Sequence, residues 1–335
     1  MRVPEGLRVD TVDYHTAGEP FRIITSDVGA IEGGTILEKR RFVRENLDDI
    51  RKLLVYEPRG HADMYGCFVV EPNDATGDLG VLFFHNEGYS TACGHGTIAL
   101  VTWALESGRV QPRGDKAILV DAPSGRLETF ATIDDDDVTS VRFRNVPSFV
   151  YATDVAVTLA GERVTCDISY GGAFYASVES SRFGLSVTPK NVDDFIRIGR
   201  SIKAGIHAQM EVVNPVEPEL RDVYGVIFYE TLGREPLTQR NVTVFADGEV
   251  DRSPCGSGTS ARLALLDASG ELPRGSELIH HGIVNTVFSA RVSGSAKVGD
   301  LPAVITEVEG SAHYTGSHSF VLEPQDEVGT GFLLR

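Results

Sequence analysis

The sequence contains few cysteines and no long apolar run, and each shortage excludes a class of protein. Its 335 residues include only 4 cysteines, which are too few and too scattered for a disulfide framework, so we expect reduced thiols in a cytoplasmic protein. The longest apolar stretches are short, such as Ile98–Leu105, whereas a membrane-spanning helix needs about 20 apolar residues. The N-terminal residues also lack the apolar segment of a secretory signal. We therefore expect neither a membrane span nor a secretory signal.

Basic residues are in deficit, which bears on the partners of the protein. The chain has 31 Lys and Arg against 48 Asp and Glu, a formal net charge of −17. A surface of this sign repels a phosphate backbone, so we expect no nucleic-acid partner. The one acidic run, Asp134–Asp137, lies between two strand-like stretches and is typical of a solvated turn.

Strand-like patterns outnumber helical ones along the chain. Apolar residues have helical spacing in Asn46–Leu54 and Asn191–Ile202, and two further helices are expected at residues 95–106 and 257–267. Alternating or short apolar runs predict strands at Val81–Phe84, Ala117–Val120, Leu127–Ile133, Val138–Val146, Phe149–Val157, Ala173–Val178, Val242–Phe245 and Ala303–Val308. Many strands and few helices indicate an α+β protein in which sheets dominate.

Two segments about half the chain length apart share one pattern. Residues 93–99 read CGHGTIA and residues 255–261 read CGSGTSA, and each opens an apolar, helix-like run. Length alone, at roughly 150 residues per domain, already favours two domains. The repeat predicts two similar lobes, each donating an equivalent element to a shared centre. We place them at residues 1–147 and 148–335, with the last strand as a candidate to return to the first lobe.

The repeated pattern suits acid–base chemistry at a carbon atom. Gly-x-Gly at the start of a helix points unpartnered backbone N–H groups at one spot, where they bind a carboxylate and lower the pKa of an adjacent thiol. With Cys93 and Cys255 on opposite sides of one α-carbon, a thiolate would remove the α-proton and a thiol would protonate the other face. That scheme needs no cofactor and no metal. The competing interpretation is that both are small buried apolar residues, which we expect of Cys67 and Cys166.

Six segments together resemble the proline racemase family, which includes hydroxyproline 2-epimerases and trans-3-hydroxyproline dehydratases. They are Asp13–Pro20 (DYHTAGEP), Pro58–Met64 (PRGHADM), His85–Thr97 (HNEGYSTACGHGT), Gly171–Ala176 (GGAFYA), Asp251–Thr259 (DRSPCGSGT) and Gly310–Gly316 (GSAHYTG). The resemblance covers nearly the whole chain. It implies a diaminopimelate epimerase-like fold with two pseudo-symmetric lobes, each a sheet wrapped round a central helix, and a site in the cleft between them.

The resemblance also implies roles for individual residues, and the substrate it implies is a small imino acid. The family's two acid/base cysteines match Cys93 and Cys255, and its group near the ring nitrogen of the substrate matches Asp251. The backbone cradle for the substrate carboxylate matches Gly94, His95, Gly256 and Ser257. Members of the family are often dimers, so a homodimer is a possible assembly.

The second cysteine discriminates between reactions within the family. Dehydratases carry threonine there, because elimination needs only one base at the α-carbon, so Cys255 favours inversion of hydroxyproline or proline. Two departures weaken this assignment. Ala92 precedes Cys93 where many members have methionine, and the stretch Asp222–Tyr229 lacks the substrate-binding histidine of 4-hydroxyproline epimerases and looks more like the dehydratase branch.

Three functions therefore stay open on the sequence. The first is a cofactor-independent 4-hydroxyproline 2-epimerase or proline racemase, and the second is a trans-3-hydroxy-L-proline dehydratase or a dual epimerase and dehydratase. The third is a non-catalytic amino-acid-binding protein or a thiol redox protein that joins Cys93 to Cys255.

The histidines do not form a recognisable metal motif. Zinc sites use tight spacings such as Cys-x2-Cys or His-Glu-x-x-His, and neither occurs, so we expect no metal site. His15 and His61 either shape the cleft or are structural. We expect His280 and His281 at the surface.

Overall fold

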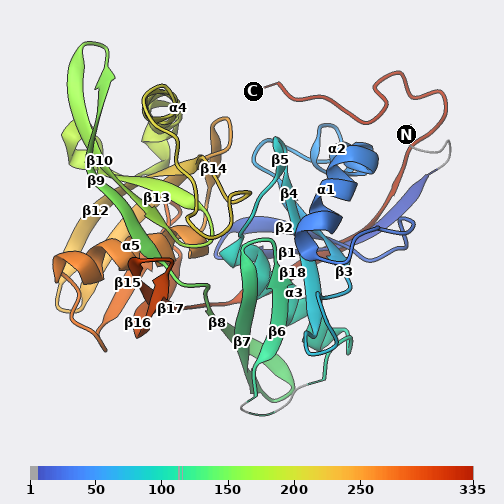
Figure 1. The fold of residues 1–335 in the computed structure, drawn as a ribbon. Coiled ribbons are helices and arrows are strands. Elements are labelled where there is room, and N and C mark those ends of the chain that lie inside the picture. The colour runs from blue at the N-terminus through green and yellow to red at the C-terminus, as the bar shows by residue number, and fades with distance from the viewer. Residues whose placement is uncertain (1–6, 112–113, 115, 335) are drawn as a thin grey trace. The chain divides into compact units, whose positions relative to one another are not determined.

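The structure is a computed structural model that describes residues 7–111, 114 and 116–334. By its internal contacts the chain divides into two compact units, one formed by Met1–Val141 with Ser311–Arg335 and the other by Arg142–Gly310. Each unit combines a mixed sheet with a few helices (Figure 1), which confirms the α+β class.

The first unit is built on a sheet that the end of the chain completes. Its elements are β1 (Arg8–Thr16), β2 (Glu19–Ile24), α1 (Ile36–Asn46), α2 (Asp48–Val55), β3 (Tyr65–Val70), β4 (Leu79–His85), β5 (Gly88–Tyr89), α3 (Gly94–Glu106), β6 (Ile118–Ala122), β7 (Gly125–Asp134), the start of β8 (Asp137–Arg144), and β18 (Ala312–Val321). The strands pair in the order β18-β1-β2-β3-β4-β6-β7, with β2–β3 and β4–β6 parallel and the other pairs antiparallel.

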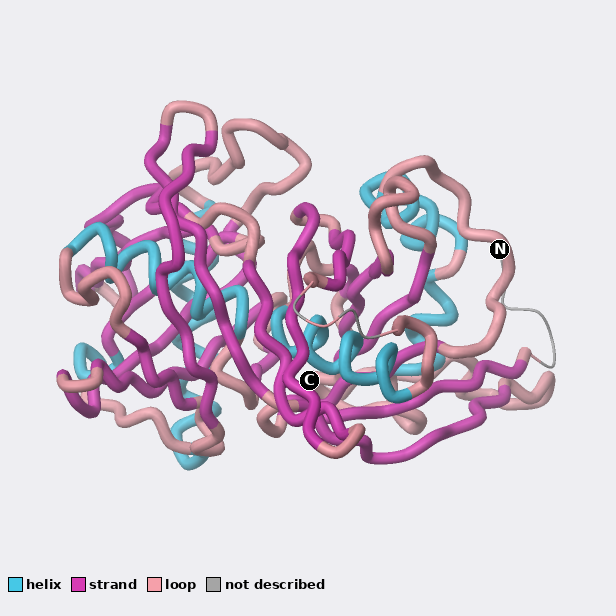
Figure 2. The backbone as a smooth tube through the Cα atoms, turned by 90° about the horizontal axis from the view of Figure 1, so that it is seen from below, coloured by secondary structure: helices cyan, strands magenta, loops and turns pink. Residues whose placement is uncertain are grey.

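Helix α3 is the centre of this unit. Its sequence, GHGTIALVTWALE, has no polar face, and a helix that is apolar all round is stable only when it is enclosed. Residues from Gly94 to Ala104 are buried, and the helix contacts β1, β2, β3, β7 and β18. Figure 2 shows it running along the strands of its own unit. The predicted helix at residues 95–106 is thus confirmed.

Helices α1 and α2 pack on β4, and only the second of them was predicted. Apolar spacing in Asn46–Leu54 matches α2, which buries Ile50, Leu53 and Leu54. Helix α1 has a charged sequence, ILEKRRFVREN, that masks its short apolar stripe. A capping box fixes its start, since Thr35 accepts from the Glu38 amide and the Glu38 side chain accepts from the Thr35 amide.

The second unit repeats the plan of a wrapped helix. Its elements are β9 (Phe149–Leu159), β10 (Glu162–Tyr170), β11 (Phe174–Glu179), the 3-10 turns Ser180–Phe183 and Pro189–Asn191, α4 (Val192–His207), β12 (Val223–Arg234), β13 (Leu237–Phe245), β14 (Glu249–Asp251), α5 (Gly256–Ser269), β15 (Glu277–His281), β16 (Val287–Val298) and β17 (Leu301–Gly310). The strands pair in the order β9-β10-β11-β12-β13-β15-β16-β17, with β11–β12 and β13–β15 parallel.

Helix α5 occupies the position in this unit that α3 has in the first. It is buried from Gly256 to Leu266 and contacts β9, β10, β11, β16 and β17, and it ends at Gly270 in the left-handed conformation. Helix α4 packs on β9, β12 and β13 through an apolar stripe that includes Phe195, Ile198 and Ile202. The two heptapeptides that repeat in the sequence therefore start the two central helices.

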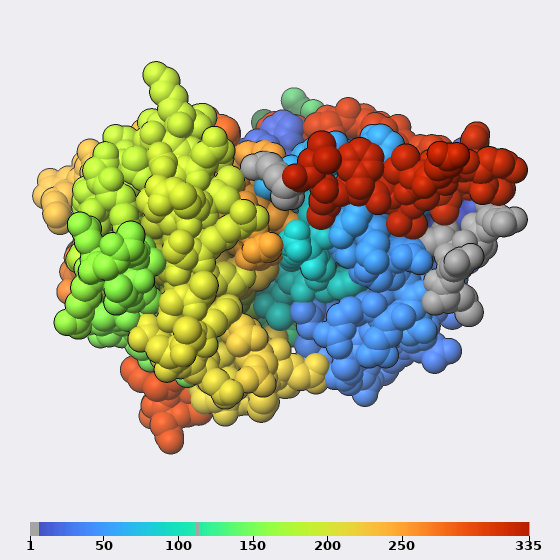
Figure 3. Space-filling model, turned by 90° about the horizontal axis from the view of Figure 1, so that it is seen from above, coloured from blue at the N-terminus to red at the C-terminus, as the bar shows by residue number. Residues whose placement is uncertain are grey.

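The C-terminal segment lies on the first unit, where the space-filling view shows it across the N-terminal part of the chain (Figure 3). Phe332 exchanges two backbone hydrogen bonds with Glu57, at 3.1 and 3.0 Å. Arg59 donates to the Asp326 carboxylate at 2.5 Å and to the Gly329 carbonyl at 3.0 Å. None of the described helices is long and apolar enough to cross a membrane.

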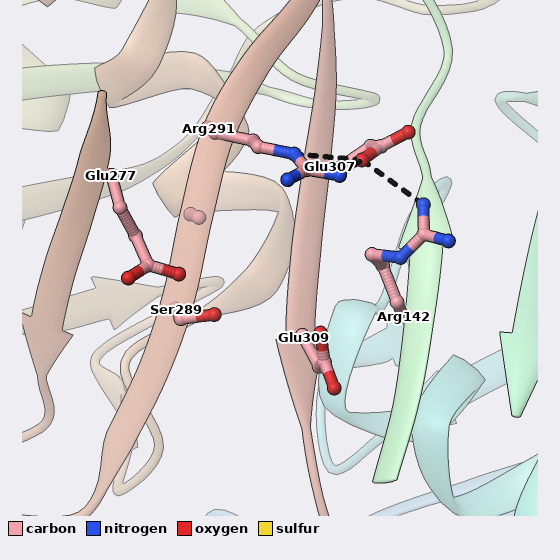
Figure 4. A pocket seen from close by; sticks show the side chains of 7 residues that line it. Arg142, Glu277, Ser289, Arg291, Glu307 and Glu309 are labelled. Atoms are coloured by element: carbon pink, nitrogen blue, oxygen red, sulfur yellow. Dashed lines mark hydrogen bonds and ion pairs between the residues drawn. The ribbon is translucent and has the colours of Figure 1, made fainter. Parts of the chain in front are cut away.

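A charged pocket on the second unit is held together by one glutamate (Figure 4). Glu307 on β17 accepts from Arg291 on β16 at 2.7 Å, from Arg142 on β8 at 3.0 Å, and from Arg144 at 3.1 Å. Burial alone would raise the pKa of Glu307, but the three arginines lower it below the usual value of 4.5. The ionised side chain thus joins three strands.

Replacing this glutamate by glutamine tests that role. We expect Glu307→Gln to lower the free energy of unfolding by about 1–3 kcal/mol at neutral pH, because charge-assisted hydrogen bonds are lost. Since the folded pKa is depressed, the stabilisation is present above the unfolded pKa and is lost as pH falls through the folded pKa. Urea unfolding across pH 3–7 measures this, with Glu277→Gln in the same pocket as the control, and an equal effect of both variants would contradict it.

Candidate active site

Cys93 lies directly before helix α3 and caps it. Its backbone is extended, with φ −153° and ψ 102°, and its Sγ accepts from the Gly96 amide at 3.2 Å. A thiol in this position faces the unpartnered amides and the positive end of a helix, which favour the thiolate. Thr97 closes the turn, because its amide and hydroxyl both donate to the Cys93 carbonyl, at 3.0 and 2.8 Å.

His95 packs beside this thiol inside an aromatic enclosure. Its ring nitrogens lie 3.5 and 3.6 Å from Cys93 Sγ, and its ring meets Phe21 and Tyr65 edge to face. The backbone at Gly96 lies too close to its neighbours for a side chain, because a Cβ there would lie 2.3 Å from the Phe21 ring and 2.7 Å from Cys93 Sγ. The Gly-x-Gly spacing therefore has a packing reason at its second glycine.

Cys255 precedes helix α5 with a different backbone. Its φ is 61°, in the left-handed region that few residues other than glycine adopt, and its amide is held by Ser253 Oγ at 3.1 Å. The Thr259 amide donates to the Cys255 carbonyl at 2.6 Å. A Cβ on Gly258 would lie 2.9 Å from Cys255 Sγ, so this glycine lets the first turn of the helix approach the sulfur. Strained backbone of this kind concentrates at functional sites.

Asp251 is buried next to this cysteine, at the end of β14. Its Oδ1 accepts from the amide and the hydroxyl of Ser253, at 2.8 and 2.7 Å. Burial raises the pKa of Asp251 to about 6, although the Ser253 hydrogen bonds oppose the shift. Burial also raises the pKa of the Cys255 thiol, and the charge of Asp251 raises it further. At neutral pH this half of the site therefore holds a carboxylate beside a protonated thiol.

Ser257 is in the first turn of α5, where its hydroxyl meets a tyrosine that the sequence analysis did not single out. Tyr175 on β11 places its hydroxyl 2.7 Å from Ser257 Oγ and 3.8 Å from Cys255 Sγ. A Cβ on Gly171 would lie 2.3 Å from the Ser257 carbonyl, so the glycine pair before β11 brings this strand against the helix. The GGAFYA motif was the signal that could have identified Tyr175.

The structure thus groups the seven predicted site residues within the two units. Cys93, Gly94 and His95 come together at the start of α3, and Asp251, Cys255, Gly256 and Ser257 come together between β14 and α5. All seven are buried. Among the described residues, no three His, Cys, Asp or Glu side chains gather as metal ligands.

His280 corrects an expectation, because it lies in the core and not at the surface. His280 is fully buried on the face of β15 that helix α5 covers, where Thr259 of the helix contacts its ring. Its Nε2 accepts from the Asn241 amide at 3.0 Å, which leaves the proton on Nδ1, 2.8 Å from Thr259 Oγ1. Asn241 and Thr259 both donate to the Pro254 carbonyl, at 2.9 and 3.1 Å. The imidazole therefore supports the peptide that leads into Cys255.

Removing this ring should destabilise the second unit. We expect His280→Ala to lower the free energy of unfolding by about 2–4 kcal/mol, since it leaves a cavity and two buried polar groups without their partner. The neighbouring His281→Ala should change it by less than about 0.5 kcal/mol. Burial lowers the pKa of His280 to about 3, below the ordinary 6.5, so native stability should fall as pH falls through that interval, and the variant should lack this component. Urea unfolding at several pH values measures both effects, and equal stabilities of the two variants would contradict the assignment.

Two further cysteines and two further histidines lie on other elements of the chain. Cys67 and Cys166 are buried in strands, and burial raises the pKa of Cys166 to about 12 and that of Cys67 still higher. His15 faces His313 across the β1–β18 pair with ring centroids 5.2 Å apart, and burial and that neighbour lower the pKa of His15. His61 is exposed.

Known proteins match the chain over its whole length. The family model described as "Proline racemase" matches residues 11–333. A trans-3-hydroxy-L-proline dehydratase of Bacillus cereus is 47% identical over 325 residues, 97% of each chain. A 3-hydroxyproline 2-epimerase of Burkholderia multivorans is 46% identical over 337 residues, 100% of each chain. The crystal structure of a hydroxyproline epimerase from Agrobacterium vitis, with bound trans-4-hydroxy-L-proline, has a TM-score of 0.91 at 28% identity and covers 100% of this chain and 97% of its own.

These matches confirm the resemblance that the six motifs indicate, and with it the diaminopimelate epimerase-like α+β fold. The similarity is continuous from the first motif to the last, so it is not limited to one unit. The chain belongs to the proline racemase family of enzymes.

Proposed function

We propose that this protein inverts the α-carbon of a hydroxyproline without a cofactor, and that Cys93 and Cys255 are its two acid/base residues. The observation that carries the proposal is the repeated arrangement of a buried cysteine directly before a buried helix, once in each unit. If the two cysteines were only buried apolar residues of the core, neither the repeated arrangement nor the left-handed backbone of Cys255 would be needed. A role of two equivalent thiols as acid and base explains these two features.

The chemistry follows from the groups at each helix start. One thiolate forms an S–H bond with the α-proton, and the electron pair of the broken C–H bond moves onto the substrate carboxylate. The first-turn amides, at Gly94 and His95 and at Gly256 and Ser257, stabilise the charge that develops there. The other thiol then gives its proton to the opposite face of the α-carbon. The carboxylate of Asp251 is the partner we propose for the ring ammonium.

The resting protonation state supports a division of labour. Because burial and Asp251 raise the pKa of Cys255, that residue rests as the thiol, which is the acid of the pair. Cys93 accepts a backbone amide and faces a helix N-terminus, and both interactions favour a base. Before substrate binds, we therefore assign the base to Cys93 and the acid to Cys255.

The substrate we propose is a hydroxyproline with its hydroxyl at C3. The Bacillus cereus and Burkholderia multivorans relatives are both named for a 3-hydroxyproline. Polar groups that could meet a ring hydroxyl, Tyr175 and Ser257, lie next to Cys255. Proline, which lacks the hydroxyl, is the matched comparison substrate.

Dehydration of trans-3-hydroxy-L-proline is the second candidate, and the name of the Bacillus cereus relative favours it. The first step is the same removal of the α-proton. The C3–O bond then breaks, the hydroxyl leaves as water with a proton from an acid group, and the unsaturated ring rearranges to a pyrroline carboxylate. Cys255 favours inversion over this outcome, because elimination needs one base only.

A substrate panel followed by proton NMR in deuterated water tests the proposal. We expect the α-proton signal of a 3-hydroxyproline to disappear while the signals of its C2 epimer appear without the α-proton. A pyrroline carboxylate from trans-3-hydroxy-L-proline would instead identify a dehydratase. Binding of the imino acids without exchange or product would contradict the proposal and favour a binding protein.

All four cysteines are buried thiols, which supports our inference that the protein works in the reducing cytoplasm.

A further inference from the structure

The hydroxyl of Tyr175 lies between two polar atoms at the start of α5. It is 3.8 Å from Cys255 Sγ and 2.7 Å from Ser257 Oγ. The three side chains are buried, with 1%, 6% and 4% of Tyr175, Cys255 and Ser257 exposed. Protein groups therefore surround the thiol, and its hydrogen-bond partners set the relative stability of its two protonation states.

The two hydrogen bonds that link Cys255, Tyr175 and Ser257 can point in either direction. When Cys255 is a thiol, S–H donates to the Tyr175 oxygen and the Tyr175 hydroxyl donates to Ser257. When Cys255 is a thiolate, the Ser257 hydroxyl donates to the Tyr175 oxygen and the Tyr175 hydroxyl donates to sulfur. Each hydroxyl carries one proton and accepts as well as donates, so rotating both reverses the two hydrogen bonds without moving a heavy atom.

We propose that Tyr175 is a positioning residue for the proton of Cys255, because its hydroxyl partners the thiol as an acceptor and the thiolate as a donor. The proposal rests on the acid–base role proposed above for Cys255. An enzyme that inverts both isomers needs Cys255 in both protonation states, because this sulfur must be the acid for one isomer and the base for the other. A group that partners only one state would slow the other half of the cycle.

The other groups around the sulfur act differently on its two protonation states. The Asp251 carboxylate on β14 opposes the thiolate, whereas the Gly258 amide on α5 and the Thr243 hydroxyl on β13 support it. The second partner of the Thr243 hydroxyl is the Asn241 side-chain oxygen at 3.3 Å, which can only accept. Arg252 follows Asp251 in the chain, and Tyr224 on β12 packs edge to face on Tyr175. Tyr175 differs from these neighbours because its second partner, the Ser257 hydroxyl, can itself either donate or accept.

Close packing holds the tyrosine in this place. Tyr175 belongs to a buried cluster with Ala173, Ile227, Cys255 and Ala261. The chain at Gly171 approaches the first two turns of α5, where a Cβ would lie 2.5 Å from the Ala261 amide, and this contact fixes the strand relative to the helix. Tyr175→Phe should keep this packing, because it removes only the hydroxyl.

The rate at which iodoacetamide alkylates Cys255 tests the proposal without any substrate. Only the thiolate reacts, so the rate at a fixed pH follows the thiolate fraction and a change in rate reports a shift of the thiol pKa. Mass spectrometry of the peptide that follows Arg252 isolates this cysteine. Losing one hydrogen bond to a charged group should slow alkylation of Cys255 about 10- to 100-fold at a fixed pH, equivalent to raising its pKa by about 1 to 2. Alkylation of Cys93 in the same sample should keep its native rate.

Two further variants complete the experiment. Tyr151→Phe makes the same chemical change at a half-buried tyrosine of the same unit, whose hydroxyl donates to the Glu211 carbonyl, and should leave the Cys255 profile unchanged. Ser257→Ala should slow alkylation of Cys255 by a smaller factor than Tyr175→Phe. If Tyr175→Phe does not fold, the result for Ser257→Ala alone tests the proposal. A native Cys255 profile in Tyr175→Phe, or in Ser257→Ala alone if only that variant folds, would overturn the proposal. Because this measurement needs no turnover, a protein inactive on every imino acid would refute the proposed function and leave this result standing.

Discussion

Cys93→Ser is expected to lower the rate of inversion about 10²- to 10⁴-fold, the range for loss of a general acid or base. A serine hydroxyl does not ionise near neutral pH, so it cannot replace the thiolate. It remains a good helix N-cap, however, and can accept from the Gly96 amide as sulfur does, so the fold should survive. Proton NMR of the substrate and urea unfolding of the variant measure the two effects separately.

The matched control for this experiment is Cys166→Ala, which removes a buried thiol on β10 that we place outside the site. It should cost some stability but leave the turnover number within about twofold, since catalysis depends on groups that touch the substrate. Equal rates for Cys93→Ser and the native enzyme would show that Cys93 is not an acid/base residue.

Cys255→Ser is expected to lose inversion as Cys93→Ser does, but to retain exchange of the α-proton for the opposite isomer. With Cys93 as the remaining base, one isomer of the substrate should still exchange its α-proton with solvent without inverting, and the other isomer should not exchange. Cys93→Ser should exchange the opposite isomer. Inversion itself should fall about 10²- to 10⁴-fold in both variants.

Cys255→Thr separates the two candidate reactions. Threonine should abolish inversion while trans-3-hydroxyproline dehydration, if the enzyme has that activity, continues at about the native rate. The β-branched side chain must adopt the left-handed backbone of residue 255, so some loss of stability is expected as well. Chiral chromatography and pyrroline detection on one sample measure both reactions, and continued inversion by Cys255→Thr would contradict the two-base scheme.

The central helices could be predicted from sequence because local and tertiary signals agree there. Cys-Gly-x-Gly-Thr followed by a mostly apolar run favours one arrangement, a helix that begins at the glycine and is enclosed by strands. Helix α1 could not be predicted in the same way. Its charges hide the apolar stripe, and its start depends on a capping box that is weak evidence without the partner strand.

The candidate site was predictable in part. The cysteines, the helix-start residues and Asp251 follow from the two motifs, whereas Tyr175 and His280 reach the site from strands distant in sequence. His280 was misjudged because two adjacent histidines look solvated. The alternation of Leu278 and His280 on one face of β15 was the available sign of burial. Which face is enclosed depends on strand pairing, and pairing of distant strands is not encoded locally.

The most direct test of the two-base proposal is the isotope content of product and substrate at the start of the reaction in deuterated water. With a separate base and acid, the first product formed should carry deuterium at the α-carbon, while the unreacted substrate keeps its protium. A product that retains the protium of the substrate, or substrate that exchanges faster than product forms, would show that one group does both jobs, and the paired roles of Cys93 and Cys255 would have to be abandoned.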